Sequence, residues 1–214
     1  MPDPEIVIFD LGGVLIDWDP RRLYRKLFGG DEERMERFLA EVCTPAWNHR
    51  LDEGRPFTEA IAELVTRFPQ QADLIRAYHH RWPEMLGGPI AATVTVLESL
   101  NACGAPLWAI TNWSAETFPV VRDDPDYAFL GWFQEVFVSG ALRMAKPGEA
   151  IFAHALERIR APARACLFID DNPANLATAA RLGMRTHRFT TAAALAGELR
   201  RLGLLAGAAT APAG

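Results

Sequence analysis

The sequence predicts an α/β protein in which a bundle of helices is inserted into a parallel sheet. Short apolar runs, typical of buried strands, alternate with helical stretches over most of the chain, and this alternation is the pattern of βαβ units. The exception is the segment of residues 20–85, where the pattern stays helical. Half of the 214 residues are hydrophobic, so the chain can bury a sizeable core.

Five strands are expected, and each is a short, mainly apolar run. They cover Ile6 to Phe9, Leu107 to Ile110, Glu135 to Val138, Cys166 to Ile169 and Arg185 to Phe189. Helical stretches such as Ala91 to Ala102 and Glu149 to Ile159 separate them. Because strands joined by helices pair in parallel, residues 1–19 and 86–202 are predicted to form one Rossmann-like core.

The helical segment begins at Asp19-Pro20, an N-cap residue followed by proline at the first helical position. Its predicted helices are Arg21 to Phe28, Asp31 to Val42, Thr58 to Phe68 and Gln70 to Arg81. No strand is predicted in it, and turn signals at Trp82-Pro83 and Gly87-Gly88-Pro89 end it. Residues 20–85 are therefore expected to form a helical domain, and residues 203–214, rich in Ala and Gly, a flexible tail.

Composition excludes several classes of protein. The net charge is -5 and no basic stripe is visible, which argues against nucleic acid as a partner. The three cysteines follow no CxxC or Cys/His pattern, so reduced thiols are expected. No apolar run reaches the ~18 residues needed to span a membrane, and Met1-Pro2-Asp3 lacks the basic start of a signal peptide. We expect a soluble, cytoplasmic protein, and the sequence indicates no oligomeric state.

Three carboxylates follow two of the predicted strands. Asp10 comes directly after the first strand, with Gly12 and Gly13 just beyond it, and Asp170 and Asp171 follow the strand that ends at Ile169. Ligands bind beyond the carboxyl ends of parallel strands, so the three should meet at one edge. Carboxylates this close repel one another unless a proton or a cation separates them. Oxygen ligands suit a hard cation, here Mg2+ holding a phosphate.

Four short segments occur in the order that is typical of the haloacid dehalogenase superfamily. They are Asp10-Leu11-Gly12-Gly13-Val14, Thr111-Asn112, Lys146-Pro147, and Asp170-Asp171 with Asn175. Over residues 5–189 the chain resembles the helical-cap members of this superfamily. It is similar to small sugar-phosphate phosphatases such as bacterial glucose-1-phosphate phosphatases, which also read Asp-Leu-Gly in the first segment.

The resemblance implies a role for each carboxylate. Asp10 would be the nucleophile, attacking phosphorus to form an aspartyl-phosphate, and this divides one difficult hydrolysis into two easier displacements. Asp10, the carbonyl of Gly12 and Asp171 would bind Mg2+ directly. Asp170 would contact the metal through a water molecule or would hydrogen-bond to the direct ligands. The sequence does not determine which of Asp170 and Asp171 is the direct ligand. Asn175 would either steady the metal ligands or face solvent.

The resemblance also implies contacts to the phosphate. Thr111 would donate its hydroxyl, the backbone amides of Asn112 and Trp113 would add donors, and Lys146 would offset the developing negative charge. The segment of residues 46–55 resembles the specificity loop of helical-cap relatives. There Trp47 would stack on a sugar ring, while Arg50, His49 or Asp52 would bind its hydroxyls. Trp18 and Trp113 either line the same pocket or belong to the core.

The chain departs from the superfamily at Gly12. Most phosphatases of this type carry there an Asp that acts as general acid to the leaving group and then as base for water. Such catalysis is typically worth ~10²- to 10⁴-fold, so its loss matters unless another group substitutes. Asp17 and Asp19 are near in sequence and His49 lies on the cap, but none is a convincing substitute.

Three functions follow from these residues. The first is an enzyme, a Mg2+-dependent phosphatase acting on a small phosphorylated metabolite such as a sugar phosphate. The second is a 2-haloacid dehalogenase that uses Asp10 without a metal, and it is disfavoured because metal-free attack on carbon has little use for the Asp170-Asp171 pair. The third, motivated by Gly12, is a non-catalytic relative that binds phosphate or a partner protein.

Overall fold

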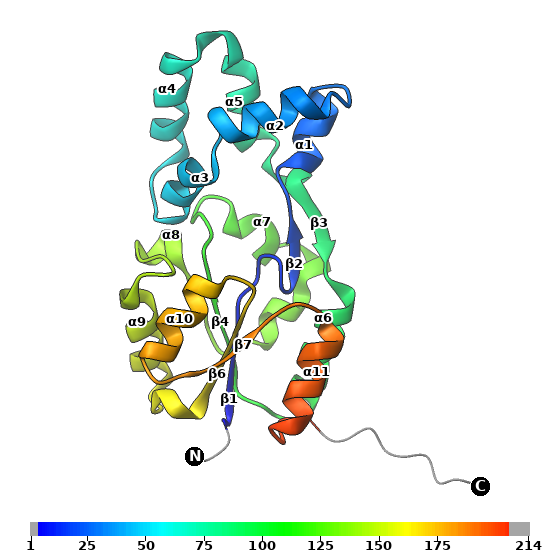
Figure 1. The fold of residues 1–214 in the computed structure, drawn as a ribbon, viewed down its shortest axis with the longest axis vertical. Coiled ribbons are helices and arrows are strands. Elements are labelled where there is room, and N and C mark those ends of the chain that lie inside the picture. The colour runs from blue at the N-terminus through cyan, green and yellow to red at the C-terminus, as the bar shows by residue number, and fades with distance from the viewer. Residues whose placement is uncertain (1–3, 206–214) are drawn as a thin grey trace, which may run out of the picture.

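The computed structural model describes residues 4–205, with a five-stranded parallel sheet at the centre of the lower half in Figure 1. The strand order is β5-β4-β1-β6-β7. The strands are β1 (Ile6–Phe9), β4 (Leu107–Thr111), β5 (Val136–Val138), β6 (Cys166–Asp170) and β7 (Arg185–Arg188). All five predicted strands are present, with ends shifted by at most one residue. The predicted Rossmann-like α/β fold is confirmed.

Helices cover both faces of the sheet because side chains along each strand alternate in direction. Val7 and Phe9 belong to the cluster that includes α6 (Ala91–Ala102) and α11 (Ala192–Arg201). Ile8, between them, packs in a second cluster against α9 (Glu149–Ile159) and α10 (Pro173–Arg181). Shorter helical turns lie in the connections between strands: α7 (Phe118–Arg122), α8 (Ser139–Leu142) and the 3₁₀ helices η3 (Pro125–Trp132) and η4 (Ala163–Ala165).

Five helices form a separate group above the carboxyl ends of the strands, hereafter the helical module (Figure 1). They are α1 (Arg21–Leu27), α2 (Glu32–Glu41), α3 (Pro45–Asp52), α4 (Phe57–Arg67) and α5 (Ala72–His80), with the 3₁₀ helices η1 (Pro69–Gln71) and η2 (Trp82–Met85). Buried aromatic rings hold the module together. Tyr78 on α5 contacts the rings of Tyr24, Trp47 and Phe57, so helices distant in sequence share one core.

Two features of the module differ from the sequence prediction. The chain enters and leaves it through a two-stranded antiparallel ribbon, β2 (Ile16–Trp18) and β3 (Leu86–Pro89), where turns and no strand were expected. The ribbon was missed because each strand is too short to show periodicity and pairs only with the other. Residues 46–55, expected as a loop, are mostly the helix α3, which begins at a Thr44 cap whose hydroxyl accepts the N–H of Trp47 (3.1 Å).

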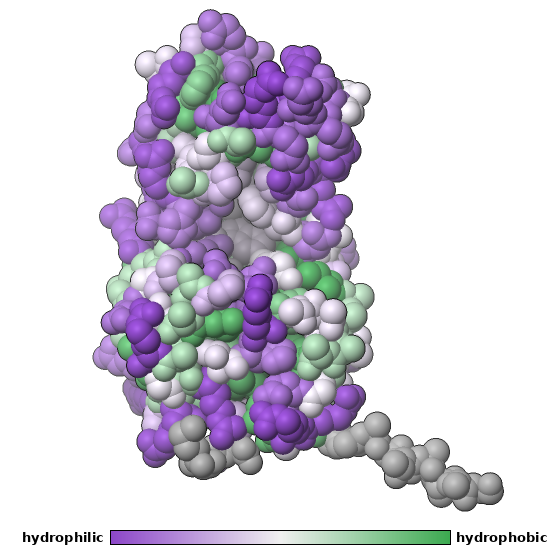
Figure 2. Space-filling view, viewed as in Figure 1, coloured by the Kyte–Doolittle hydropathy of each residue, from purple (hydrophilic) through white to green (hydrophobic). Residues whose placement is uncertain are grey.

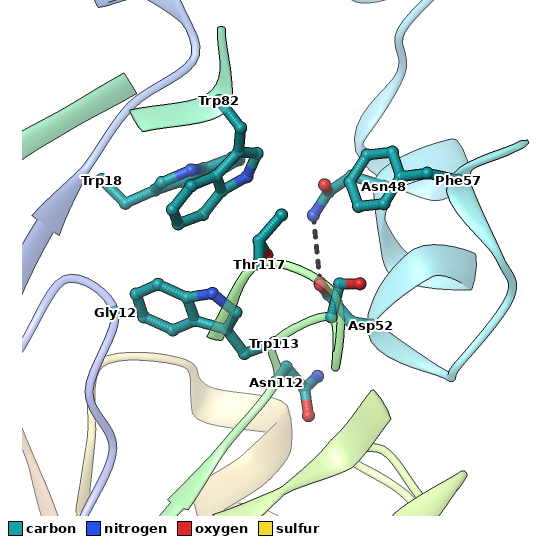
Figure 3. Close-up of a pocket in the computed structure, with 10 residues that line it drawn as sticks. Gly12, Trp18, Asn48, Asp52, Phe57, Trp82, Asn112, Trp113 and Thr117 are labelled. Atoms are coloured by element: carbon teal, nitrogen blue, oxygen red, sulfur yellow. Dashed lines mark hydrogen bonds between the residues drawn. The ribbon is translucent and has the colours of Figure 1, made fainter. Parts of the chain in front are cut away.

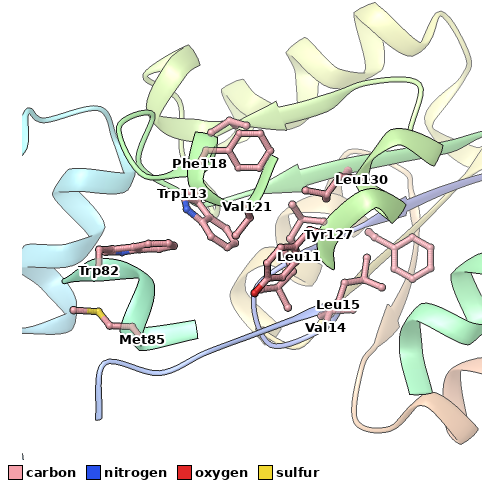
Figure 4. Close-up of a cluster of buried hydrophobic side chains, with 14 of the residues drawn as sticks. Leu11, Val14, Leu15, Trp82, Met85, Trp113, Phe118, Val121, Tyr127 and Leu130 are labelled. Atoms are coloured by element: carbon pink, nitrogen blue, oxygen red, sulfur yellow. The ribbon is translucent and has the colours of Figure 1, made fainter. Parts of the chain in front are cut away.

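A hollow lies between the helical module and the sheet, visible at mid-height in Figure 2. Apolar packing joins them beside this hollow. The cluster drawn in Figure 4 brings together η2, the loop after β1 and the segment after β4, through Trp82, Met85, Leu11, Val14, Trp113, Phe118 and Val121. Trp82 and Trp113 pack with ring centroids 5.6 Å apart, so this contact closes one side of the hollow.

Residues 202–205, which follow α11, pack against the core. Leu204 donates its N–H to Leu199 (2.9 Å), and Leu204 and Leu205 pack on the cluster that contains α11. The remainder of the predicted tail, residues 206–214, lies outside the described residues. Within residues 4–205 no helix is long and apolar enough to cross a membrane.

Replacing Gly140, at the start of α8, with Ala should destabilise the protein. A Cβ at this position would lie 2.5 Å from the nitrogen of Ala115 and 2.7 Å from the carbonyl oxygen of Trp113, and backbone cannot rotate away. Overpacking of this kind costs about 1–3 kcal/mol and should lower the melting temperature by several degrees. Gly131→Ala is the control, because its Cβ would meet no atom within 4 Å. Equal melting temperatures for the two variants would contradict this packing.

Candidate active site

The three carboxylates identified in the sequence meet at the carboxyl edge of the sheet. Asp10 follows β1, Asp170 ends β6 and Asp171 comes next. β1 and β6 are neighbours, and the strand order reverses between them, since β4 and β5 lie on one side and β6 and β7 on the other. Open α/β sheets bind ligands at such switch points. Carboxylate oxygens of the three residues lie within 4.8 Å of one another.

Lys146 lies between two of these carboxylates. Its Nζ is 2.9 Å from Asp10 Oδ1 and 2.7 Å from Asp170 Oδ2, and it also donates to the carbonyl oxygen of Ile110 (2.8 Å). Only 1% of the lysine is exposed. Asn112 fixes its backbone from both sides, accepting the N–H of Lys146 (2.8 Å) and donating to its carbonyl oxygen (2.8 Å). The ammonium is thus held at one point by the ends of β1, β4 and β6.

Asp170 is fully buried, and its hydrogen-bonding capacity is satisfied by protein. Besides Lys146, it accepts the N–H of Asn172 (2.8 Å) and the side-chain amide of Asn175, whose Nδ2 lies 3.1 and 3.0 Å from the two oxygens. Asn175 therefore faces Asp170 and not solvent. Asn172, through its Oδ1, caps α10 (2.9 Å to Ala174 N), so neither Asp is needed as the helix cap.

Asp171 differs from Asp170 because it is exposed at the mouth of the site. Its Oδ2 lies beside Gly13, where a Cβ would come within 3.1 Å of that oxygen. Gly13 also has a φ of 73°, in the left-handed region that favours glycine. Partial desolvation of its carboxyl group, followed by the charge of Asp170, raises the pKa of Asp171 above its usual range. Of the pair, Asp171 is the carboxylate free to reach a ligand.

The charges at this edge are strongly coupled. Burial raises the pKa of Asp10 to about 7, with the charge of Lys146 opposing the rise and that of Asp170 adding to it. Burial alone would lower the pKa of Lys146, but the charges of Asp10 and Asp170 outweigh it, and the pKa lies above its usual range. A buried carboxylate without a positive partner takes up a proton. Full ionisation of the three carboxylates at neutral pH therefore needs more positive charge than Lys146 supplies.

Of the groups predicted to contact the phosphate, some are free to do so and others already have hydrogen-bond partners in the protein. Thr111 ends β4 with 1% exposure, and its hydroxyl has no hydrogen-bond partner within the described residues. A buried, unpaired donor of this kind is expected to have a ligand partner. The N–H of Trp113, by contrast, donates to Ser139 Oγ (2.9 Å), which corrects its predicted role at the phosphate. In Asn112 the side-chain oxygen and one amide N–H are taken by the backbone of Lys146, which leaves the second amide N–H and the backbone N–H for a phosphate.

A pocket lies between these residues and the helical module (Figure 3). It encloses about 430 Å³ of space outside protein atoms, its open mouth included. The lining residues are Gly12, Trp18, Asn48, Asp52, Phe57, Trp82, Asn112, Trp113, Ser114 and Thr117. Three indole rings gather on one side and the polar pair Asn48 and Asp52 lies on the other. The indole N–H groups of Trp18 and Trp113 have no hydrogen-bond partner among residues 4–205.

Two residues predicted to touch the substrate are not at this pocket. Trp47 is 2% exposed, packs edge-on against Tyr78 with centroids 4.9 Å apart, and directs its indole N–H at the carbonyl of Ala60 (3.4 Å). Arg50 projects from α3 toward Glu63 on α4, 4.0 Å away. Both predictions are corrected, because residues 45–52 are helical and a helix turns successive side chains to different sides.

Other pocket residues escaped the sequence analysis. Trp82 was interpreted as a turn signal, and Asn48 was not singled out. Asn48 and Asp52 are four residues apart, so on a helix they share a face, and Asn48 Nδ2 donates to Asp52 Oδ2 (3.0 Å). That spacing is a usable signal once α3 is known to be a helix. Nothing in the sequence near Trp82 indicates that its ring reaches a site formed by residues 10–18 and 112–117.

The arrangement of a carboxylate after the first strand, a buried lysine and an acidic pair after the fourth core strand matches a known family. The model of the haloacid dehalogenase-like hydrolases matches residues 4–183. The chain belongs to this family. The chain is similar over nearly its whole length to a sesquiterpene phosphatase of Aspergillus oryzae. The two are 28% identical over 203 residues, which cover 91% of this chain and 94% of that protein.

Solved structures show the same fold. A predicted family hydrolase from Porphyromonas gingivalis has a TM-score of 0.71 and 25% identity, covering 93% of this chain and 97% of that one. A family enzyme from Bacteroides thetaiotaomicron, in complex with magnesium and inorganic phosphate, has a TM-score of 0.64 and 20% identity. The match covers 87% of this chain and 94% of that one. L-2-haloacid dehalogenase from Xanthobacter autotrophicus scores 0.61 at 18% identity, covering 95% and 85%. One fold thus serves different reactions in the family, and the site has to discriminate between them.

Lys146→Met should destabilise the protein by about 3 kcal/mol near pH 7.5, because it leaves Asp10 and Asp170 buried without their positive partner. Without Lys146 the pKa of Asp10 rises further, so the folded state holds a proton that the unfolded chain releases above pH ~4. The folded state of the variant therefore loses stability as pH rises and regains it as pH falls. The difference in unfolding free energy between Lys146→Met and the wild type should be smaller at pH 5.5 than at pH 7.5. Denaturant unfolding at both pH values measures it.

The matched control is Lys26→Met. Lys26 is the only other lysine and forms an exposed ion pair with Glu84 (2.9 Å), so its removal should change stability little at either pH. A Lys146→Met deficit that is independent of pH, or no larger than that of the control, would show that the buried carboxylates do not depend on this cation.

Proposed function

We propose that the protein is a Mg2+-dependent phosphatase that hydrolyses a small phosphate monoester through an aspartyl-phosphate on Asp10. The observation that carries the proposal is the convergence of three carboxylates, the buried ammonium of Lys146 and the unpaired hydroxyl of Thr111 at one edge of the sheet. Hydroxyl and ammonium donors serve an anionic substrate, and clustered carboxylates serve a hard cation.

In the proposed reaction Asp10 is the nucleophile. A carboxylate oxygen of Asp10 attacks phosphorus, the ester P–O bond breaks, and the leaving oxygen takes a proton. Water then attacks the aspartyl-phosphate, phosphate leaves and Asp10 is restored. Lys146 holds Asp10 in place, with Nζ 2.9 Å from Oδ1, and Thr111 donates to a phosphate oxygen. These contacts favour the charge that develops in transfer.

The metal requirement rests on the donor set. Asp10 and Asp171 offer carboxylate oxygens at the mouth of the site, and the carbonyl of Gly12 is the third predicted ligand, an all-oxygen set that suits Mg2+. Asp170 is the supporting member, since its oxygens are already held by Lys146, Asn172 and Asn175. Mg2+ held by these residues would supply positive charge that offsets the negative charge of the phosphate.

The helical module is proposed to act as the cap. Residues 20–85 would form this domain over a core made of residues 1–19 and 86–202. The pocket supports the assignment because its lining comes from both parts: Gly12, Asn112 and Trp113 from the core, and Asn48, Asp52 and Phe57 from the module. A lid over the reacting phosphate excludes water that is not part of the reaction.

The pocket also bears on the substrate. A sugar phosphate fits the polar side of the pocket, where Asn48 and Asp52 can bind hydroxyl groups. The indole rings of Trp18, Trp82 and Trp113 equally suit the apolar face of a sugar or a hydrocarbon chain. The relative named a sesquiterpene phosphatase makes the second class worth testing alongside the first.

A metal-free dehalogenase is the weaker candidate. Its substrate is a small carboxylate, which an arginine such as Arg50 could bind, but Arg50 lies beside Glu63 and away from the pocket. Without a metal, the exposed carboxylate of Asp171 would only repel an anionic haloacid. Both features favour phosphate chemistry.

Wild-type protein should release phosphate from members of a panel of sugar phosphates, terpenyl monophosphates and other small esters when Mg2+ is present, and Asp10→Asn should abolish release. The amide is a poor nucleophile but keeps the shape of the side chain. Asp73→Asn, an exposed change on α5, is the control and should leave the rates unchanged. Phosphate release is measured over the panel with Mg2+ or with a chelator, and no release from any ester would reject the phosphatase.

Mg2+ should raise the melting temperature of the wild type, because a ligand that binds only the folded state stabilises it. Asp171→Asn should remove most of this rise, since it deletes the carboxylate that is free to bind, whereas Asp73→Asn should retain it. Thermal unfolding with increasing Mg2+ measures the effect without any substrate. An undiminished rise in Asp171→Asn would exclude Asp171 as a direct ligand.

A further inference from the structure

The site lacks an acid where the family's phosphatases usually carry one. Gly12 stands two residues after Asp10 and lines the pocket. A Cβ built on Gly12 would meet no atom within 4 Å, so no other part of the protein fills the space beside it. A leaving group can enter there, and a proton donor has to come from elsewhere on the pocket wall.

Asp52 is the carboxylate that lines this pocket from the module. It is the last residue of α3 and lies across from Gly12 and next to Asn112 and Thr117 in Figure 3. Its Oδ2 accepts from Asn48 Nδ2 (3.0 Å), and the hydroxyl of Tyr78 in turn donates to Asn48 Oδ1 (2.9 Å). This chain of hydrogen bonds fixes the orientation of the carboxylate.

The backbone at Asp52 is attached to the core. Ser139, at the start of α8, donates its hydroxyl to the carbonyl oxygen of Asp52 (2.5 Å) and accepts the N–H of Trp113 (2.9 Å). Nearby, Gly54 packs so closely on the core that a Cβ would lie 2.7 Å from the carbonyl oxygen of Gly140. The end of α3 is therefore held in a fixed position relative to the strand ends that carry the catalytic groups.

We propose that Asp52 supplies the general acid and base that Gly12 cannot. The inference rests on the proposed phosphatase function. As the Asp10 oxygen bonds to phosphorus and the ester bond breaks, Asp52 transfers its proton to the leaving oxygen. As water attacks the aspartyl-phosphate, Asp52 takes a proton from that water, the bond from phosphorus to Asp10 breaks, and phosphate leaves. Asp52 ends protonated, as it began.

The surroundings suit this role. Burial raises the pKa of Asp52 to about 7, against the opposing effect of the Ser114 N–H, and the charges of Asp10 and Glu53 add to the rise. The other groups that face this region are neutral or paired: the Tyr78 hydroxyl, whose pKa burial raises well above its usual value, and His49, 3.5 Å from Glu53. A pKa near neutrality makes both protonation states accessible, as acid–base catalysis requires.

The other candidates for the acid lie away from the pocket next to Gly12. Asp17 forms an ion pair with Arg22, and Asp19 accepts the N–H of Arg21 (2.9 Å) at the start of α1. His49 is partly exposed and lines a neighbouring cavity beside α1 and α2. None of the three lines the pocket next to Gly12. Among the carboxylates of residues 4–205 that line this pocket, Asp52 stands alone.

The test compares two aromatic esters of similar size, benzyl phosphate and p-nitrophenyl phosphate, with full-length protein and Mg2+. Benzyl alcohol needs a proton to leave, whereas p-nitrophenolate leaves as a stable anion. Asp52→Asn should lower kcat/KM for benzyl phosphate by about 10²- to 10³-fold and for p-nitrophenyl phosphate by less than about 10-fold. For the wild type, kcat/KM with benzyl phosphate should fall as pH rises above about 7, and Asp52→Asn should lack this fall.

Two further variants keep the outcome interpretable. Glu53→Gln removes the neighbouring exposed carboxylate, the smallest contributor to the raised pKa of Asp52, and should retain most of the rate with both esters. Asp52→Glu retains an acid and should show a much smaller difference between the two esters than Asp52→Asn. Equal losses for both esters, or no loss, would overturn the acid–base role while leaving the phosphatase intact. No phosphate from either ester with wild-type protein, in the presence of Mg2+, would overturn both.

Discussion

The buried contact of Lys146 with Asp10 and Asp170 is the interaction on which the site depends. A buried ammonium is tolerated only where negative charge and hydrogen-bond acceptors surround it, and here the ends of β1, β4 and β6 supply them. Without the ammonium of Lys146, the carboxylates of Asp10 and Asp170 on adjacent strands would repel each other. Charge balance thus joins three strand ends and fixes the position of Asp10. The pairing of Asn112 with the backbone of Lys146 extends this constraint to the loop after β4.

Around this centre the core and the module contribute different things. The core carries the groups that would meet a phosphate, and their positions follow from the sheet. The module carries residues that face the remainder of the substrate, and their positions depend on how α3 docks. Ser139 links the two, because its hydroxyl contacts both Trp113 beside the pocket and Asp52 at the end of α3. A change in the docking of α3 would alter the wall of the pocket while leaving the strand ends in place.

Because Gly12 has no acidic side chain, the proton for the leaving group would have to come from the module. In a site whose acid lies beside the nucleophile, proton transfer does not depend on the module. With Gly12 at that position and Asp52 on α3, proton transfer to the leaving group would require the module to be docked. Substrate recognition and leaving-group activation would then depend on the same helix. The aromatic rings opposite Asp52 limit which leaving groups present an oxygen to it, so shape would contribute to the choice of substrate.

The sequence by itself determined the strands of the core and the carboxylates at their ends, because buried strands have a local apolar pattern and each motif follows its strand directly. It did not determine the β2–β3 ribbon, whose short strands pair across some seventy residues of chain, nor that α3 buries Trp47 and turns Asp52 to the pocket. These depend on contacts between segments far apart in sequence. Periodicity within one segment shows which side chains share a face, but only tertiary packing decides what that face meets.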